Sequence, residues 1–226
     1  FSDSGYHADP LLTCPEDVHK LAVPTFASGT RMGNRVDIIK EIAKTQKGVR
    51  YIFGICIGPF TEYTNARGVE DGLCEFLEDP DEMLEGMKFF NENGLKFIEK
   101  QLDAGADGIQ IVEPSCSLIS PAMYEEYVLP LHKELVAKIQ ERNNGFARLH
   151  ICGDTTRMQP YSLASGTRIL DCDYQVDLGA CYKNLGPGQV FCGNINPAGE
   201  LLQGKPEDFK ALVRKIYDDT HNRCII

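Results

Sequence analysis

The sequence lacks any apolar run approaching the roughly 18 residues that a transmembrane helix needs. It also shows no signal peptide and no lipidation motif. Basic residues are scarce, with 23 Lys and Arg against 33 Asp and Glu and a formal net charge of −10. That balance argues against a nucleic-acid backbone or an anionic membrane surface as the main partner. We therefore expect a cytoplasmic protein that binds neither nucleic acids nor membranes.

Closely spaced cysteine pairs are absent as well. The nine cysteines, an odd number, lie singly along the chain, which is typical of reduced thiols buried as small apolar residues. With 226 residues, of which 42% are hydrophobic, the chain can bury one sizeable core. We expect a single domain over residues 1–226. Its two ends, residues 1–3 and 223–226, look like parts of strands, so we expect parts of that domain to be missing.

Strands and helices alternate along the chain. The expected strands are 49–57, 108–112, 148–152, 168–172, 189–192 and 224–226. The expected helices are 80–101, 121–140, 155–164, 178–185 and 206–218. Such alternation with short links predicts a parallel sheet with right-handed crossovers.

Two α/β architectures fit this alternation, an open doubly wound sheet and a closed eight-stranded barrel. Neither G-x-G-x-x-G nor the P-loop motif follows any expected strand, which removes the best argument for a nucleotide-binding open sheet. Counting a possible strand at 1–3, the chain supplies about seven of the eight strands of a barrel. We predict a TIM-type (β/α)8 barrel that is incomplete at one or both ends.

Polar groups follow the expected strands repeatedly, in segments 58–60, 113–116, 150–154, 171–173 and 192–194. Barrel enzymes gather their reactive side chains at this carboxyl end. The most informative segment holds His150 and Cys152, which share one face because strand side chains alternate. Imidazole and thiolate are common zinc donors, so the pair predicts part of a metal site. The ordinary alternative is a buried histidine beside a core cysteine.

A catalytic zinc site needs about three protein ligands, and the residues leave the third one open. Its candidates are Cys116, Cys192, Cys224 and a residue beyond Ile226.

Other polar residues have weaker claims to a role in the site. Asp3 and Asp154 are the candidate acids or bases, and the candidate substrate-binding groups are Glu113, Asp173 and Asn194. Carboxylates in such positions, Asp177 included, are also common helix caps. The Asn-Ile-Asn-Pro segment that begins at Asn194 is also typical of an ordinary turn. The remaining histidines, His7, His19, His132 and His221, are expected at the surface.

Residues 105–207 resemble the uroporphyrinogen decarboxylase superfamily, and within it the corrinoid-dependent methyltransferases that methylate coenzyme M or related acceptors. The matching pieces are Gly105-Ala106-Asp107-Gly108, Ser120-Pro121, Tyr124-Glu125-Glu126-Tyr127, Leu129-Pro130, His150-Ile151-Cys152-Gly153-Asp154, Asp171-Cys172-Asp173, Val176-Asp177-Leu178, Cys192-Gly193-Asn194 and Pro197. Phe1-Ser2-Asp3 resembles the strand that carries the superfamily's active-site aspartate. Residues 4–50 match only weakly.

The resemblance implies a zinc-dependent methyltransferase on a TIM-type barrel. In these enzymes H-x-C and a distant C-terminal cysteine bind zinc, so His150 and Cys152 match the first two ligands. The third would follow Ile226, unless Cys224 replaces it. The implied methyl donor is methylcobalamin on a separate corrinoid protein. The implied acceptor is a small thiol, which zinc would make nucleophilic, or a similar molecule.

Two alternatives stay open beside this favoured interpretation. A uroporphyrinogen decarboxylase needs no metal or cofactor, and Asp3 would hold the pyrrole nitrogens of its tetrapyrrole. Its arginine-bearing N-terminal segment is not in this chain, and His150 and Cys152 would have no role. The other alternative is a non-catalytic corrinoid- or tetrapyrrole-binding protein.

Overall fold

A computed structural model describes residues 9–142 and 145–226. Within these ranges six strands form one parallel sheet in the order β1-β2-β3-β4-β5-β6. The strands are β1 (Phe53–Ile57), β2 (Gly108–Val112), β3 (Phe146–His150), β4 (Ile169–Asp171), β5 (Val190–Cys192) and β6 (Cys224–Ile225). The order follows the sequence without the reversal that marks a doubly wound sheet. The predicted α/β fold with barrel-type strand order is confirmed.

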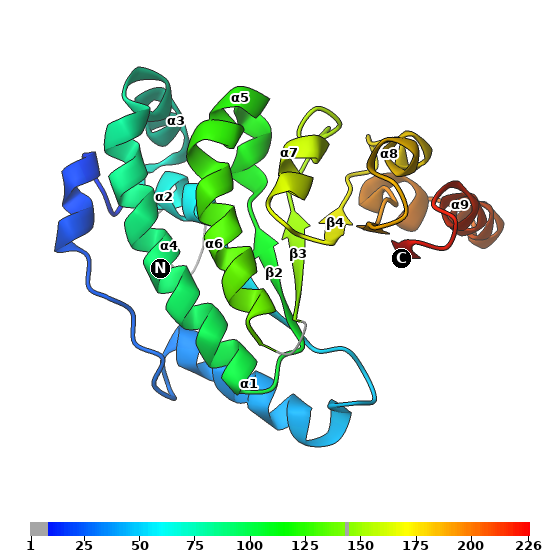
Figure 1. Ribbon diagram of the computed structural model, residues 1–226, viewed down its shortest axis with the longest axis horizontal. Coiled ribbons are helices and arrows are strands. Elements are labelled where there is room, and N and C mark those ends of the chain that lie inside the picture. Colours follow the sequence, from blue (N-terminus) through cyan, green and yellow to red (C-terminus); the bar gives the residue numbers. More distant parts are fainter. Residues whose placement is uncertain (1–8, 143–144) are drawn as a thin grey trace.

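The helices lie between and beside these strands (Figure 1). The α-helices are α1 (Arg31–Gln46), α2 (Pro59–Arg67), α3 (Val69–Glu78), α4 (Pro80–Asp103), α5 (Pro121–Met123), α6 (Leu129–Gln140), α7 (Gln159–Ala164), α8 (Leu178–Leu185) and α9 (Pro206–Asp219). Four short segments are 3-10 or π helices: η1 (Pro15–Lys20), η2 (Pro114–Leu118), η3 (Tyr124–Val128) and η4 (Pro197–Leu201). None of the helices in the described residues is long and apolar enough to cross a membrane.

Several helix ends follow directly from local sequence. Asp79 caps α4 by accepting a hydrogen bond from the Glu82 N–H, and Pro80 occupies the first turn, where a missing N–H costs nothing. Asp177 caps α8 through the Ala180 N–H. Asp177 therefore serves as a helix cap, the ordinary role that such a carboxylate suggests.

The two faces of the sheet differ in what covers them. Helices α4 and α6 pack on β1 and β3, and the alternate residues that face them, such as Ile109, Ile111 and Leu149, are buried. The residues between them, including Gln110 and Arg148, point to the opposite face and are partly exposed. This second face corresponds to the interior of a barrel, and it carries the polar side chains of the site.

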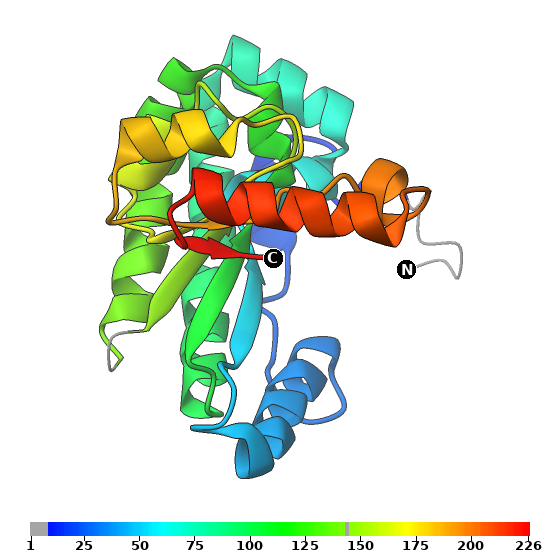
Figure 2. The same ribbon diagram turned by 90° about the vertical axis from the view of Figure 1, so that its right-hand side faces the viewer.

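The two ends of the sheet also differ. Figure 2 shows α1 at the bottom of the view, near the amino ends of β1–β3, and α3 at the opposite end. Helix α2 begins at Pro59, directly after β1, so α2 and α3 lie at the carboxyl end of the strands. The sequence did not indicate α1, α2 or α3. Most predicted bounds also shift: β1 starts at Phe53, β3 spans Phe146–His150 and α7 starts at Gln159, and several other ends move by one or two residues. The single helix predicted over 121–140 is divided into α5, the π-helical η3 and α6.

Candidate metal site at the carboxyl end of the strands

The register of the sheet aligns one residue from each strand at the carboxyl end. Val112 pairs with His150, His150 with Asp171, and Asp171 with Cys192. Paired residues in neighbouring strands point to the same face. The parallel pairing therefore brings His150 beside a carboxylate that lies 21 residues away in the sequence.

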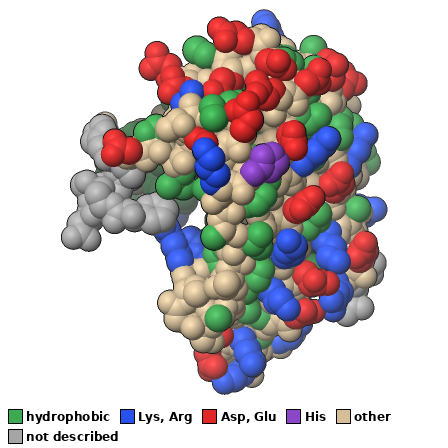
Figure 3. Space-filling model, turned by 90° about the vertical axis from the view of Figure 1, so that its left-hand side faces the viewer, with side chains coloured by type: hydrophobic (Ala, Val, Ile, Leu, Met, Phe, Trp, Pro, Cys, Tyr) green, Lys and Arg blue, Asp and Glu red, His purple; other side chains and the backbone are tan. Residues whose placement is uncertain are grey.

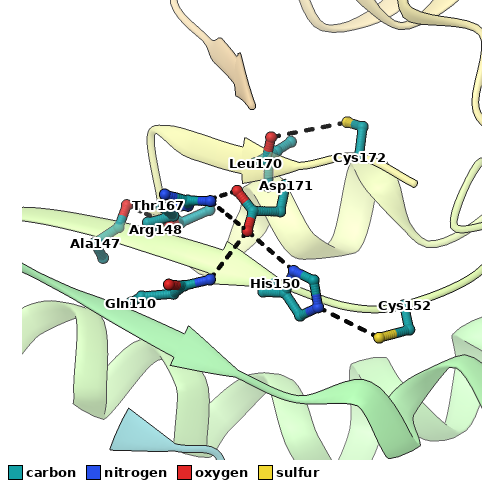
Figure 4. A network of polar contacts seen from close by, with 9 residues as sticks. All are labelled: Gln110, Ala147, Arg148, His150, Cys152, Thr167, Leu170, Asp171 and Cys172. Atoms are coloured by element: carbon teal, nitrogen blue, oxygen red, sulfur yellow. Dashed lines mark hydrogen bonds and ion pairs between the residues drawn. The ribbon is translucent and has the colours of Figure 1, made fainter. Parts of the chain in front are cut away.

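His150 and Cys152 face each other as their spacing predicts. The His150 Nε2 atom lies 3.3 Å from the Cys152 Sγ atom (Figure 4). In a tetrahedral zinc site, with Zn–N of about 2.0–2.1 Å and Zn–S of about 2.3 Å, these two donors are separated by roughly 3.6 Å. The two atoms thus fit as neighbouring ligands of one ion after a small adjustment.

The other ring nitrogen of His150 is fixed by Asp171. His150 Nδ1 lies 3.0 Å from Asp171 Oδ2. Arg148 donates to both Asp171 oxygens, at 2.6 and 2.9 Å, and the Gln110 amide donates at 3.0 Å. A carboxylate on Nδ1 holds the ring so that Nε2 is left for a metal. Figure 4 shows this chain of contacts running from Arg148 through Asp171 and His150 to Cys152.

The charges around the pair suit a bound cation. Burial raises the pKa of Asp171, but hydrogen bonds from His150 and Arg148 outweigh burial, so the pKa lies below its ordinary value. Burial and the nearby Asp173 and Asp171 carboxylates raise the pKa of the Cys152 thiol. Without a cation, this sulfur therefore stays protonated at neutral pH, and a bound cation would favour the thiolate.

None of the cysteines proposed as third ligand joins the pair. Cys116 is fully buried. Cys192 lies in the aligned row, but Asp171 stands between it and His150. Cys224 pairs with Phe191, which is buried on the helix-covered face, so it points away from His150. In the described ranges no three His, Cys, Asp or Glu side chains form a group that could hold a metal. A ligand beyond Ile226 stays a prediction.

The structure describes two of the three aspartates that were predicted to act near His150 and Cys152. Asp3 lies outside the described residues. Asp154 is exposed and accepts hydrogen bonds from the Thr156 N–H and hydroxyl, at 3.1 and 2.6 Å, which lower its pKa. The Asp173 carboxylate accepts the Gly153 N–H at 3.2 Å. It therefore holds the turn directly after Cys152, where Gly153 has a φ of +77° that other residues rarely adopt.

Asn194 ties down a loop beside the site. Its amide donates to the carbonyls of Asp173 and Val176, at 3.1 and 2.6 Å. These bonds fix the loop after β4, which carries Asp173. Asn194 and Asp173 thus fix the loop after β4 and the turn after Cys152. Binding of substrate by either residue stays a prediction.

Glu113 and His132 form a second pair, away from the barrel interior. Both side chains have no exposed surface, and His132 Nε2 lies 2.9 Å from Glu113 Oε2. The Tyr124 hydroxyl lies 2.8 Å from His132 Nδ1. The prediction of a surface position for His132 is wrong, because its polar ring is satisfied inside the protein. Glu113, a predicted substrate-binding residue, is enclosed by protein atoms instead of facing the interior of the barrel. His19 and His221 are exposed as predicted, and His7 lies outside the described residues.

Two contributors to the site were not identified from the sequence. Gln110 and Arg148 each lie two residues before the aligned row and share its face. Polar residues at that spacing in otherwise apolar strands were the available signal. Asp171 was noted in segment 171–173 without a role, because only the sheet register places it next to His150.

Comparison with known proteins agrees with this fold. A family model described as uroporphyrinogen decarboxylase (URO-D) matches residues 3–226. The methylcobamide:CoM methyltransferase MtbA of Methanosarcina acetivorans is 29% identical over 206 residues, 90% of this chain and 59% of that protein. The uroporphyrinogen decarboxylase of Nocardia farcinica is 28% identical over 141 residues, 62% of this chain and 39% of that protein.

A solved structure, a methyltransferase from Methanosarcina mazei, superposes with a TM-score of 0.82 at 20% identity, over 94% of this chain and 63% of that one. This likeness shows the shared barrel-type fold. The chain spans about three-fifths of the length of the MtbA relative. With the family model matched over nearly all its residues, the chain belongs to the uroporphyrinogen decarboxylase family.

Proposed function

We propose that this protein transfers a methyl group from a methylated corrinoid, carried by a partner protein, to a thiol or similar small acceptor. In this proposal His150 and Cys152 are two ligands of a zinc ion. The observation that carries the proposal is the approach of His150 Nε2 to Cys152 Sγ while Asp171 occupies Nδ1. The similarity to a methylcobamide:CoM methyltransferase over 90% of the chain supports methyl transfer.

A bound zinc ion would supply a positive charge that favours the thiolate form of an incoming thiol. The chain's own residues prepare the place for it. Asp171 orients the His150 ring, and Arg148 offsets the Asp171 charge through two hydrogen bonds. Asp173 holds the turn after Cys152. Asp154, exposed in the same loop, is the proposed acid or base, together with Asp3.

The carboxyl end of the strands has features that suit a protein partner. Large apolar side chains are exposed in segments that follow β2, β4 and β5: Leu118, Tyr174, Leu201 and Leu202. Exposed acidic side chains gather at the same end over α3 and the start of α4 (Figure 3): Glu70, Asp71, Glu78, Asp79, Asp81, Glu82 and Glu85. We expect the corrinoid protein to dock here with a face that is apolar around its cofactor and basic at its edge.

Metal analysis tests the zinc part of the proposal. The protein, expressed with any residues that its gene encodes before or after 1–226, should contain close to one zinc per chain. Cys152→Ala should lose most of it. Cys74→Ala is the matched control, because Cys74 is another exposed thiol but lies on α3. A wild-type protein free of metal, or equal zinc in both variants, would overturn the assignment.

An activity assay tests the reaction. Absorbance should follow demethylation of methylcobalamin when a panel of small thiols is supplied, and Cys152→Ala should abolish it. Decarboxylation of uroporphyrinogen by metal-free protein would instead establish the decarboxylase alternative, which 28% identity to the Nocardia farcinica enzyme keeps in view. Corrinoid binding without turnover of any acceptor would establish a binding protein.

A further inference from the structure

Glu113, at the end of β2, is bonded to three different parts of the protein. Its Oε1 atom accepts the Thr61 N–H at 2.5 Å, and its Oε2 atom lies 2.9 Å from His132 Nε2. Its own N–H donates to the His150 carbonyl at 2.8 Å. One residue thus connects α2, α6 and the backbone of a proposed zinc ligand.

The contact with α2 replaces a helix cap. Thr61 is in the first turn of α2, and Gly58, the residue before this helix, has no side chain to cap it. A Cβ atom on Gly58 would collide with the Glu113 carboxylate. Glycine at this position therefore lets a carboxylate from another strand reach the helix N-terminus, where negative charge is favoured.

The contact with α6 continues to Tyr124. A carboxylate only accepts hydrogen bonds, so His132 donates from Nε2, and in the neutral ring Nδ1 then accepts the Tyr124 hydroxyl. Tyr124 begins the π-helical segment η3. All three side chains are fully buried. Buried polar groups are costly unless every partner is present and aligned, so such a network fixes one geometry.

We propose that Glu113, His132 and Tyr124 are positioning residues for the metal site. The network fixes the position of the end of β2 relative to α2 and α6. The hydrogen bond from the Glu113 N–H then fixes the His150 backbone relative to β2. His150 then presents Nε2 to Cys152 at the required place. This inference rests on the proposed function, because the position of Nε2 matters only if His150 binds a metal. The hydrogen bonds that fix this position are present without a metal.

The experiment compares Tyr124→Phe with Tyr63→Phe. Each substitution removes one hydroxyl from a fully buried tyrosine, and Tyr63 donates to Glu75, outside the network. In metal-free protein, amide hydrogen exchange at Glu113 should be roughly tenfold faster in Tyr124→Phe, and it should be unchanged in Tyr63→Phe. Zinc affinity, measured by chelator competition, should fall about three- to tenfold in Tyr124→Phe only.

A further variant separates positioning from general stability. His132→Gln keeps an amide donor for Glu113 and should lose less zinc affinity than His132→Leu, which keeps none. Equal Glu113 exchange in the two tyrosine variants would overturn the inference. Faster exchange with unchanged zinc affinity would overturn it too. If the wild-type protein binds no zinc, the proposed function fails, and the exchange result alone still decides whether the network anchors His150.

Discussion

Two carboxylate–histidine pairs in the described part of the molecule are alike in chemistry and opposite in surroundings. Asp171 holds His150 at 3.0 Å, and Glu113 holds His132 at 2.9 Å. The His150 side chain is 34% exposed, whereas His132 has no exposure. We call them the open pair, Asp171–His150, and the closed pair, Glu113–His132.

The pairs differ in what the histidine contacts with its second ring nitrogen, the one that does not face the carboxylate. In the open pair it faces the Cys152 thiol on the interior face of the barrel. In the closed pair it faces the Tyr124 hydroxyl, itself buried. The exposed thiol at 3.3 Å can become a neighbouring ligand of one ion after a small adjustment. The buried phenol at 2.8 Å completes a hydrogen bond instead. One pair is thus suited to binding, and the other to holding the fold in register.

Removing the open histidine should give the largest effect on metal binding. His150→Ala takes away one of the proposed zinc donors, so we expect zinc affinity to fall at least about a thousandfold, since the metal loses a direct bond. Competition with a chromophoric chelator measures the change. His19→Ala is the control, because His19 is exposed and lies 3.5 Å from the exposed Glu85 carboxylate, away from the open pair. Wild-type affinity in His150→Ala would show that the open pair is not a metal site.

Removing the closed histidine should instead reduce stability. His132→Ala leaves the Glu113 carboxylate buried without its partner, which typically costs about 3 kcal/mol of unfolding free energy. Urea denaturation followed by circular dichroism should show this loss, while His150→Ala should lose less than about 1 kcal/mol, as partly exposed sites usually do. If the two variants exchanged these effects, the distinction between the pairs would be wrong.

The carboxylate of the open pair should have an intermediate effect. Asp171→Asn keeps the shape but loses the charge that orients His150, so zinc affinity should fall about 10- to 100-fold. Asp107→Asn is the matched control, because Asp107 also accepts from a cation and a neighbouring group, Lys47 and the Ile52 N–H, at the other end of the sheet. Equal zinc affinity in both variants would mean that Asp171 has no part in orienting the ligand.

The fold could be predicted from the sequence because local signals repeat in it. Strand β2 and helix α8 have the predicted bounds, 108–112 and 178–185. The apolar residues of the strand and the capping residue of the helix each mark these bounds locally. Helix α2 was missed for the opposite reason. Helix α2 is capped by Glu113, more than 50 residues away, and such a cap leaves no signal beside the helix itself.

The site was predictable only where its members are close in the sequence. His150 and Cys152 share a face because they lie two residues apart, and the structure places them so. Asp171 joins them through strand register, which depends on the packing of the whole sheet. His132 was misplaced because the helical pattern around it gives no sign of a buried carboxylate on a neighbouring strand.

The smallest expected effect concerns one thiol close to each pair, Cys152 for the open pair and Cys116 for the closed pair. Cys152 is exposed, and burial together with Asp173 and Asp171 raises its pKa. Cys116 has no exposed surface, and burial followed by the Glu113 charge raises its pKa well above the ordinary value. In metal-free protein at pH 7, iodoacetamide should therefore label Cys152 several-fold more slowly than a free cysteine peptide, and it should leave Cys116 unlabelled.

The pH dependence of labelling follows from the sign of these shifts. A raised thiol pKa means that the thiolate fraction of Cys152 keeps rising at a pH where the peptide is already ionised, so the gap in rate should close as the pH increases from 7 to 9.5. Mass spectrometry of peptides after timed quenching gives both rates. Zinc should protect Cys152 at every pH, because the metal would occupy the sulfur. Labelling of Cys116 in folded protein, or a Cys152 profile equal to that of the peptide, would show that the surroundings assigned to the two pairs are incorrect.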